Sequence, residues 1–245
     1  HETAGLPAPT DRRVGGKENE LHIEPGVVDG AKMVFSYGTA AAAAGYTLKL
    51  AVDDLKTHSQ ASFVVRAILA TIGVFFFFEV LPHFPVGISE VHLILGTTLF
   101  LLLGAGPAAM GLAAGLAIQG TFFAPTDLPM YFVNISTLLF PLFAMTALAK
   151  RVVPEATAYV DLDFSQVLKM SAVYQGGVVA WVAFWAIYGQ GFGAENMASI
   201  ATFGAAYMLV ILVEPIADLA VLAAAKTLRG AKTGTIFTNR LLNAA

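Results

Sequence analysis

The sequence predicts an all-α integral membrane protein, a bundle of about seven transmembrane helices with a polar N-terminal tail. Of its 245 residues, 57% are hydrophobic and 13% are charged, which is about half of the roughly 25% charge of a soluble domain. The chain contains 18 phenylalanines, and a soluble domain of this size could not bury so much apolar surface in one core. About seven stretches approach the ~20 apolar residues that cross a bilayer.

Composition divides the chain into three regions. Residues 1–21 are polar and lack the apolar core of a secretory signal peptide, so we expect a flexible N-terminal extension. Residues 22–230 carry the apolar stretches and form the expected seven-helix membrane domain. Residues 231–245 are expected to form a cytoplasmic tail.

The expected spans are bounded by helix-breaking residues. Pro82, Pro85 and Gly87 interrupt the chain before the third span, and the turn signal 104–107 separates the third span from the fourth. Pro215 is expected to break the last span near its middle. The spans lie near 31–52, 62–82, 88–104, 106–123, 130–150, 167–190 and 198–226.

Basic residues predict the orientation in the membrane. Lys and Arg flank the first and fifth connections and the C-terminal end, whereas the second, fourth and sixth connections have none. The positive-inside rule then places the N-terminus outside and the C-terminus in the cytoplasm, which requires an odd number of spans. The basic residues are Lys49, Lys56, Arg66, Lys150, Arg151, Lys169, Lys226, Arg229, Lys232 and Arg240.

Several classes of function are excluded. Without cysteine there is no thiolate metal site, Fe–S cluster or cysteine nucleophile. No Walker-type GxxxxGK[ST] motif is present, so the chain does not hydrolyse ATP by that route. A net charge of −3 without a basic cluster argues against a nucleic-acid partner.

Three histidines, His22, His83 and His92, fall at or just inside the predicted outer face. Three imidazoles near one face suit a borderline divalent ion such as Ni²⁺, Co²⁺, Cu²⁺ or Zn²⁺. The alternative is that they pack at the interface and bond to backbone carbonyls. His58 is expected to be a solvated residue of the first connection.

Four acidic residues lie within or near the spans: Glu79, Glu90, Glu214 and Asp218. An intramembrane carboxylate is costly and is a functional hypothesis by default. Glu90 could orient the imidazole of His92. For Glu214 and Asp218, structural pairing with hydroxyl groups and a role in transport or coupling both remain open. Asn134 should seek a partner within the bundle.

Small residues spaced four apart, at Ala40 and Ala44 and at Gly111 and Gly115, let helices approach closely. This pattern fits packing within the bundle or docking to a partner membrane subunit.

Residues 22–150 resemble the CbiM/NikM family, the substrate-specific membrane components of cobalt and nickel energy-coupling factor (ECF) transporters. The run His22-Ile-Glu-Pro-Gly is similar to the family's Met-His-Ile-x-x-Gly start, and residues 84–96 are similar to its FPV-x-x-x-S-x-HLLGG region. Residues 104–123 resemble the following helix pair, and Asn134 falls near the family's asparagine-containing fifth segment. Residues 151–245 fit by hydropathy only.

The resemblance implies a flat four-nitrogen metal site. Its ligands are the N-terminal amine, the amide nitrogen and imidazole of the next histidine, and a second histidine. By position these are the backbone nitrogen of Leu21, His22 and His92. Such a site favours Ni²⁺ or Cu²⁺, with Co²⁺ possible.

The sequence departs from the family pattern at residue 21. Twenty residues precede Leu21, which replaces the initiator Met, so residue 21 has no free amine in this chain. Either Leu21 is an alternative start and residues 1–20 are foreign, or the extension is native and His83, Glu24 or Glu90 completes the ligand set.

The predicted function is the substrate-binding permease component of an ECF transporter for a divalent transition metal, Ni or Co, captured at the outer face. The resemblance implies a transmembrane coupling subunit and cytoplasmic ATPase subunits as partners, in the bacterial cytoplasmic membrane. No enzymatic activity is expected in the chain itself. The alternative is a metal-binding or assembly subunit of a larger membrane oxidoreductase complex.

Overall fold

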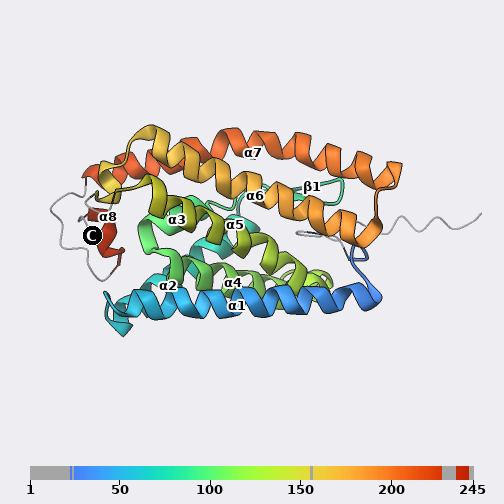
Figure 1. The fold of residues 1–245 in the computed structure, drawn as a ribbon, viewed down its shortest axis with the longest axis horizontal. Coiled ribbons are helices and arrows are strands. Elements are labelled where there is room, and N and C mark those ends of the chain that lie inside the picture. Colours follow the sequence, from blue (N-terminus) through green and yellow to red (C-terminus); the bar gives the residue numbers. More distant parts are fainter. Residues whose placement is uncertain (1–22, 24, 155–156, 228–235, 243–245) are drawn as a thin grey trace, which may run out of the picture.

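The computed structural model describes residues 23, 25–154, 157–227 and 236–242. Long helices lie side by side along the long axis of the molecule (Figure 1). The described elements are η1 (Gly30–Lys32), α1 (Met33–Leu55), α2 (Gln60–Glu79), β1 (Phe84–Val86), β2 (Ser89–Val91), α3 (Gly96–Leu103), α4 (Ala105–Phe122), η2 (Pro125–Met130), α5 (Tyr131–Val152), η3 (Tyr159–Asp161), α6 (Phe164–Gln190), α7 (Ala194–Thr227) and α8 (Asn239–Leu242).

The structure is mostly helical, as the composition predicts. Within the described residues, four helical stretches are long and apolar enough to cross a membrane: 60–79, 125–152, 164–190 and 194–227. Helices α1 and α4 are also long, with 23 and 18 residues, but each contains several glycines and polar residues, which lower its mean hydropathy.

The third expected span, 88–104, is wrong as a single helix. Residues 84–91 form an antiparallel hairpin in which Phe84 pairs with Val91 and Val86 with Ser89. The helix that follows, α3, has only 8 residues, about 12 Å of rise, which is too short to cross a bilayer. Hydropathy alone does not register the turn at Gly87, whose φ is +67°, a value that favours glycine.

From Ile88 onward the interrupted segment is largely packed in protein, whereas Phe84 and Pro85 of β1 are exposed. A side chain at Gly87 would collide with the backbone of Ser199 at the start of α7. Further along, the backbone of Ile94 contacts Glu214, and Thr98 contacts Asp218. The segment therefore runs beside α7, and every residue of α3 except Leu102 is buried. Non-helical backbone at membrane depth is tolerated under this condition.

Pro215 does not break α7, which contrasts with the expectation from the sequence. The helix is continuous from Ala194 to Thr227, and Pro215 lies inside it. Both Glu214 and Pro215 are buried. A proline removes one backbone donor, and packing against neighbouring helices allows a membrane helix to continue through it.

Helices α2 and α4 approach closely through the glycines at 111 and 115. A side-chain carbon at Gly111 would collide with Ala70, and one at Gly115 would lie 2.6 Å from Val74 Cγ1. This pair of small residues therefore serves packing within the bundle. Ala40 is half-buried and Ala44 is exposed, so for this pair both packing within the bundle and docking to a partner subunit remain open.

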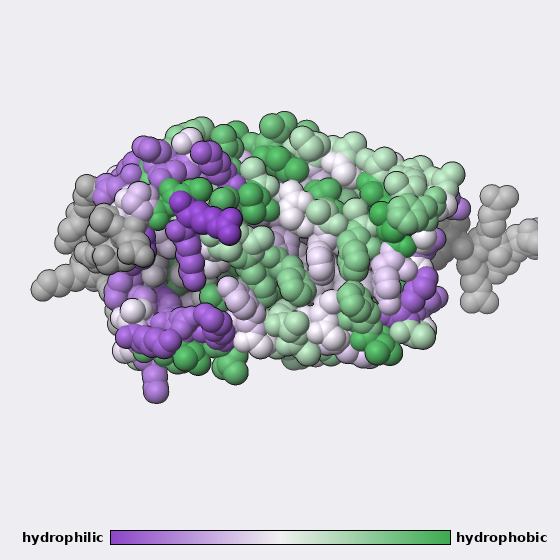
Figure 2. Space-filling model, in the orientation of Figure 1, coloured by the Kyte–Doolittle hydropathy of each residue, from purple (hydrophilic) through white to green (hydrophobic). Residues whose placement is uncertain are grey.

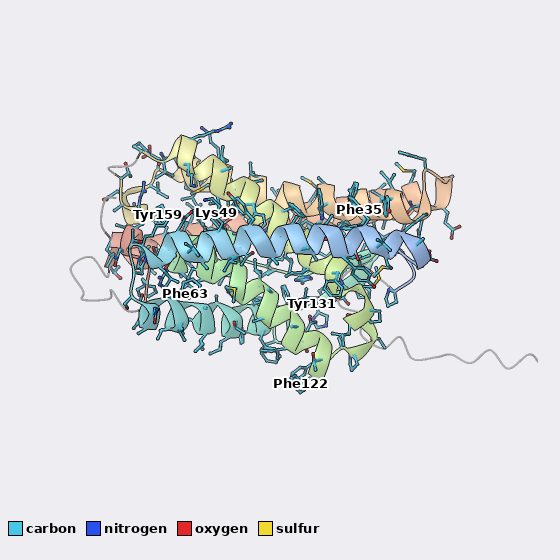
Figure 3. All side chains as sticks on the ribbon, turned by 60° about the horizontal axis from the view of Figure 1, so that its bottom comes forward. Phe35, Lys49, Phe63, Phe122, Tyr131 and Tyr159 are labelled. Carbon is cyan, nitrogen blue, oxygen red and sulfur yellow. The ribbon has the colours of Figure 1, made fainter. Side chains whose placement is uncertain are left out.

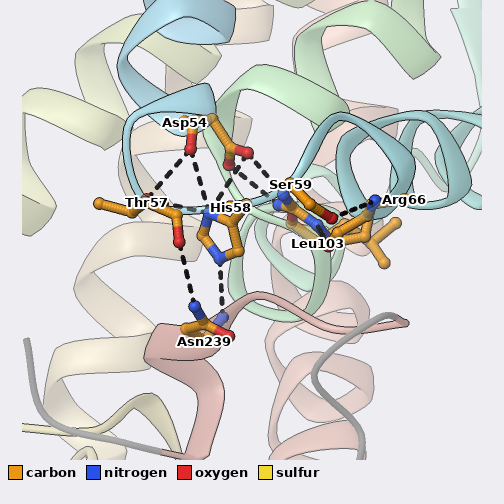
Figure 4. A network of polar contacts seen from close by, with 8 residues as sticks. Asp54, Thr57, His58, Ser59, Arg66, Leu103 and Asn239 are labelled. Carbon is orange, nitrogen blue, oxygen red and sulfur yellow. Dashed lines mark hydrogen bonds and ion pairs between the residues drawn. The ribbon is translucent and has the colours of Figure 1, made fainter.

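A buried ion pair joins Asp54 at the end of α1 to Arg66 on α2, and Arg66 also contacts the end of α3 (Figure 4). The Arg66 side chain is fully buried; its Nη1 donates to Asp54 Oδ2 at 2.9 Å and to the Leu103 carbonyl at 2.6 Å. The expectation that His58 is solvated is wrong, because its side chain is 7% exposed and faces Asp54. His58 Nε2 accepts a hydrogen bond from the Asn239 amide at 3.0 Å, so the C-terminal segment closes this network.

Gly111→Ala should destabilise the bundle, because the added methyl group meets Ala70 across the α2–α4 contact. Overpacking of this kind costs about 1–3 kcal/mol. Thermal unfolding in detergent measures the effect. The matched control is Gly38→Ala on α1, where a side-chain carbon meets nothing within 4 Å; equal melting temperatures for the two variants would contradict this account.

Arg66→Met should destabilise the protein by about 3–5 kcal/mol, because it leaves Asp54 buried without its partner. The double variant Asp54→Asn, Arg66→Met should recover part of that loss in the same unfolding measurement. Lys49→Ala, which breaks the exposed pair with Asp53, is the control and should leave unfolding unchanged. A loss after Arg66→Met no larger than the control's would show that the pair is not structural.

Candidate functional site

A small cavity lies among β2, α5, α6 and α7, and we call it the His92 cavity. Its volume is about 20 Å³, roughly what one water molecule or one ion occupies. Polar groups from distant parts of the chain converge on it. It is lined by Ile23, Ser89, Glu90, His92, Ile94, Asn134, Thr137, Leu138, Val178, Val182, Phe203 and Tyr207.

The imidazole of His92 is held in place at this cavity. The residue is 6% exposed, and the Phe78 ring packs against the imidazole with centroids 4.7 Å apart and an interplanar angle of 76°. Nδ1 lies 3.3 Å from the Leu93 carbonyl. A carbonyl only accepts hydrogen bonds, so Nδ1 carries the proton and Nε2 carries the lone pair that a metal ion would bind.

Asn134 holds the N-terminal segment at the same cavity. Its Oδ1, on buried α5, accepts a hydrogen bond from the Ile23 amide at 3.2 Å. Ile23 is 2% exposed, and the chain continues past Val27, whose carbonyl lies against Gly189 of α6. The backbone immediately after residue 22 is therefore at the His92 cavity. Leu21, His22 and Glu24 themselves lie outside the described residues.

Of the remaining predicted ligands, Glu90 lines the His92 cavity and His83 does not. Glu90 is 3% exposed in β2 and lines the cavity beside His92. His83 is half-buried, its Nδ1 lies 3.2 Å from the Leu81 carbonyl, and it does not line the cavity. Over the described parts of the chain, no three His, Cys, Asp or Glu side chains are grouped closely enough to hold a metal ion.

Glu214 and Asp218 are both engaged in hydrogen bonds. Glu214 accepts from the backbone amides of Ile94 and Leu95, the latter at 3.0 Å, and from Gln175 Nε2. Asp218 Oδ1 accepts from the Thr98 hydroxyl at 2.6 Å. The expected pairing with a hydroxyl is confirmed for Asp218, whereas the main partners of Glu214 are backbone amides.

Two residues of this region were not selected from the sequence. Gln175 on α6 donates to Glu214 and accepts from the Tyr207 hydroxyl at 2.8 Å, and Tyr207 lines the His92 cavity. The sequence does contain a signal for Gln175, because it is a side-chain amide in the middle of the apolar helix α6, away from the glutamines at its two ends, and such groups seek partners. Nothing in the local sequence distinguishes Tyr207 from the other tyrosines.

The opposite end of the molecule carries most of the described basic side chains, and we call it the basic end; Lys32, at the start of α1, is an exception and donates to the Gly189 carbonyl. Lys49 and Tyr159 lie there, whereas Phe35 and Tyr131 lie toward the cavity end (Figure 3). A groove of about 740 Å³ brings Lys150 and Arg240 together with Tyr159. Hydrophilic side chains gather at this end, and the middle of the visible face is largely apolar (Figure 2).

Comparison with known proteins identifies the family. The family model described as "Cobalt uptake substrate-specific transmembrane region" (CbiM) matches residues 22–231. No curated protein and no solved structure matched the chain. Because the match covers most of the sequence and includes the His92 cavity, the chain belongs to the CbiM family of substrate-specific transmembrane components of cobalt uptake.

Proposed function

We propose that the chain captures a divalent transition metal, Ni²⁺ or Co²⁺, at the outer membrane face as the substrate-binding permease component of an ECF transporter. The observation that carries the proposal is the His92 cavity, which has room for one ion. It is lined by one predicted ligand, His92, and by Ile23, the residue next to the other, His22.

The proposed ligands are nitrogen atoms. His92 offers Nε2, because Nδ1 faces a carbonyl. His22 offers its imidazole and its amide nitrogen, and the backbone nitrogen of Leu21 completes the set. The Asn134–Ile23 hydrogen bond supports this arrangement because it restrains the chain one residue from His22. A flat nitrogen set favours Ni²⁺ or Cu²⁺ and also accepts Co²⁺; the family's cobalt substrate leads us to propose Ni²⁺ or Co²⁺ over Cu²⁺ or Zn²⁺.

Glu90 and Asn134 would act around these ligands. Glu90 lines the cavity and is proposed to favour a cation there. If the extension before Leu21 is native, Glu90 or Glu24 takes the fourth position in place of an amine. His83 is the weaker candidate, since it does not line the cavity.

The proposed topology has seven crossings with the N-terminus outside and the C-terminus in the cytoplasm. The third crossing is composite, made of β2, residues 92–95 and α3. The basic end supports the orientation, because Lys and Arg accumulate on the cytoplasmic side. The metal would enter from outside a bacterial cytoplasmic membrane, and a transmembrane coupling subunit with cytoplasmic ATPases would supply the energy.

Family membership favours this function over the oxidoreductase alternative. The family consists of membrane transport components, so ATP hydrolysis is assigned to partner subunits.

His92→Ala should abolish stoichiometric Ni²⁺ or Co²⁺ binding, since it removes a ligand. Asn134→Ala should weaken binding by about 10–100-fold, the usual cost of losing a group that orients a ligand. Metal content by mass spectrometry and affinity by titration calorimetry measure both effects, on protein purified without a chelator or a His-tag.

His58→Ala is the control for these variants and should retain the metal. His58 belongs to the network at the basic end, far from the cavity in the bundle. A folded His92→Ala protein that still binds one metal ion would overturn the proposed site.

Exposing a free amine at residue 21 should raise the affinity for Ni²⁺. The measurement compares the full chain with a version that carries Leu21→Met as its first residue, because only the second has its terminal amine at residue 21. Equal affinities in the two versions would show that the amine is not a ligand and that a side chain completes the set.

A further inference from the structure

We propose that Glu214 is a positioning residue of the metal centre: from α7 its carboxylate holds the backbone between His92 and α3, and so aims the imidazole into the His92 cavity. The inference rests on the proposed function, because it assumes that His92 binds the metal. In this proposal Glu214, within a membrane helix, sets the geometry of the metal site without binding the metal itself.

The contact is made two residues after the proposed ligand. The Glu214 Oε1 atom accepts hydrogen bonds from two consecutive backbone amides, those of Ile94 and Leu95. Consecutive amides that point at one oxygen fix the local backbone direction. Because His92 and Ile94 are separated by a single residue, the carboxylate determines where the imidazole is presented.

The backbone at this position needs such a partner. Leu95 has φ of +53°, the one positive value among the described non-glycine residues, and this conformation is unfavourable for a residue with a side chain. Leu95 is the N-cap of α3 and provides no side-chain cap for it. The amides of Leu95 and of Ile94 before it have no partner within α3, and Glu214 supplies the acceptor oxygen from another helix.

Glu214 is in turn oriented by a chain of contacts that returns to the cavity. Gln175 Nε2 donates to Glu214, and the Tyr207 hydroxyl donates to Gln175 Oε1 at 2.8 Å. Tyr207 and Ile94 both line the His92 cavity. The path from Tyr207 through Gln175 and Glu214 to Ile94 therefore starts and ends at the walls of the site, which is the arrangement expected of a group that sets site geometry.

Asp218 offers a matched control on the same helix. It lies one turn beyond Glu214, is equally buried at 1% exposed against 0%, and bonds to Thr98 in the first turn of α3. Its partner lies beyond the connection that carries His92. Removing Asp218 tests the loss of a buried carboxylate as such, without loosening residues 93–95.

The experiment compares Glu214→Leu, Glu214→Gln and Asp218→Leu with the unaltered protein, using Ni²⁺ as the probe. Glu214→Leu removes the acceptor and should lower Ni²⁺ affinity by about 10–100-fold, with a change in the ligand-field absorption of the bound ion. Glu214→Gln keeps an acceptor oxygen and should restore most of the affinity and the original spectrum. Asp218→Leu should lower the melting temperature and leave the spectrum unchanged.

A second measurement needs no metal. Hydrogen exchange of the peptide containing residues 93–96 should be faster in Glu214→Leu than in the unaltered protein and in Asp218→Leu. If the unaltered protein binds no metal, the proposed function fails, while the exchange result still decides whether Glu214 holds this backbone.

The inference is overturned if Glu214→Leu binds Ni²⁺ with unchanged affinity and spectrum in a protein whose original form binds it. If Glu214→Leu does not fold, Gln175→Leu decides the question. That variant keeps the carboxylate and removes the group that orients it, so it should alter the spectrum in the same direction. An unchanged spectrum in Gln175→Leu would then overturn the inference.

Discussion

The structure depends on the hydrogen bonds that Glu214 accepts from the backbone amides of Ile94 and Leu95. Between β2 and α3 the chain is neither strand nor helix, yet it lies in the interior of a largely apolar bundle. Unpaired amides in such surroundings cost several kcal/mol each. The Glu214 side chain on α7 accepts hydrogen bonds from two of these amides. The irregular segment that carries His92 can therefore lie inside the bundle.

Helix α3 is held at both of its ends by contacts with other parts of the chain. Its start is held by Glu214, and near its end Arg66 and the Thr238 amide donate to the carbonyls of Leu103 and Leu102. The short helix therefore connects the His92 cavity with the Asp54 network at the basic end (Figure 4). Helix α3 therefore runs from the proposed metal site to the end of the bundle that the proposed topology places on the cytoplasmic side.

Hydropathy predicted most long helices well and failed at residues 88–104. The failure has a physical cause: hydropathy counts apolar side chains, whereas the extended backbone of β2 and the positive φ of Leu95 delay the start of α3 to Gly96. The same limit applies to His58 and Pro215. His58 lies in a loop by sequence but is enclosed by a C-terminal residue, Asn239, that follows 181 positions later, and Pro215 is accommodated by helices that sequence periodicity does not reveal.

By itself, the sequence determined the class of protein, the approximate positions of six long helices, the family, and the candidates His92, Asn134, Glu90, Glu214 and Asp218. Composition, periodicity and motif carry that information because each is local in the chain. Only the tertiary structure decided that Ile23, His92 and Asn134 share one cavity and that Glu214 serves the backbone beside His92. These contacts join residues more than 40 positions apart, and their partners are selected by helix packing, which no local pattern encodes.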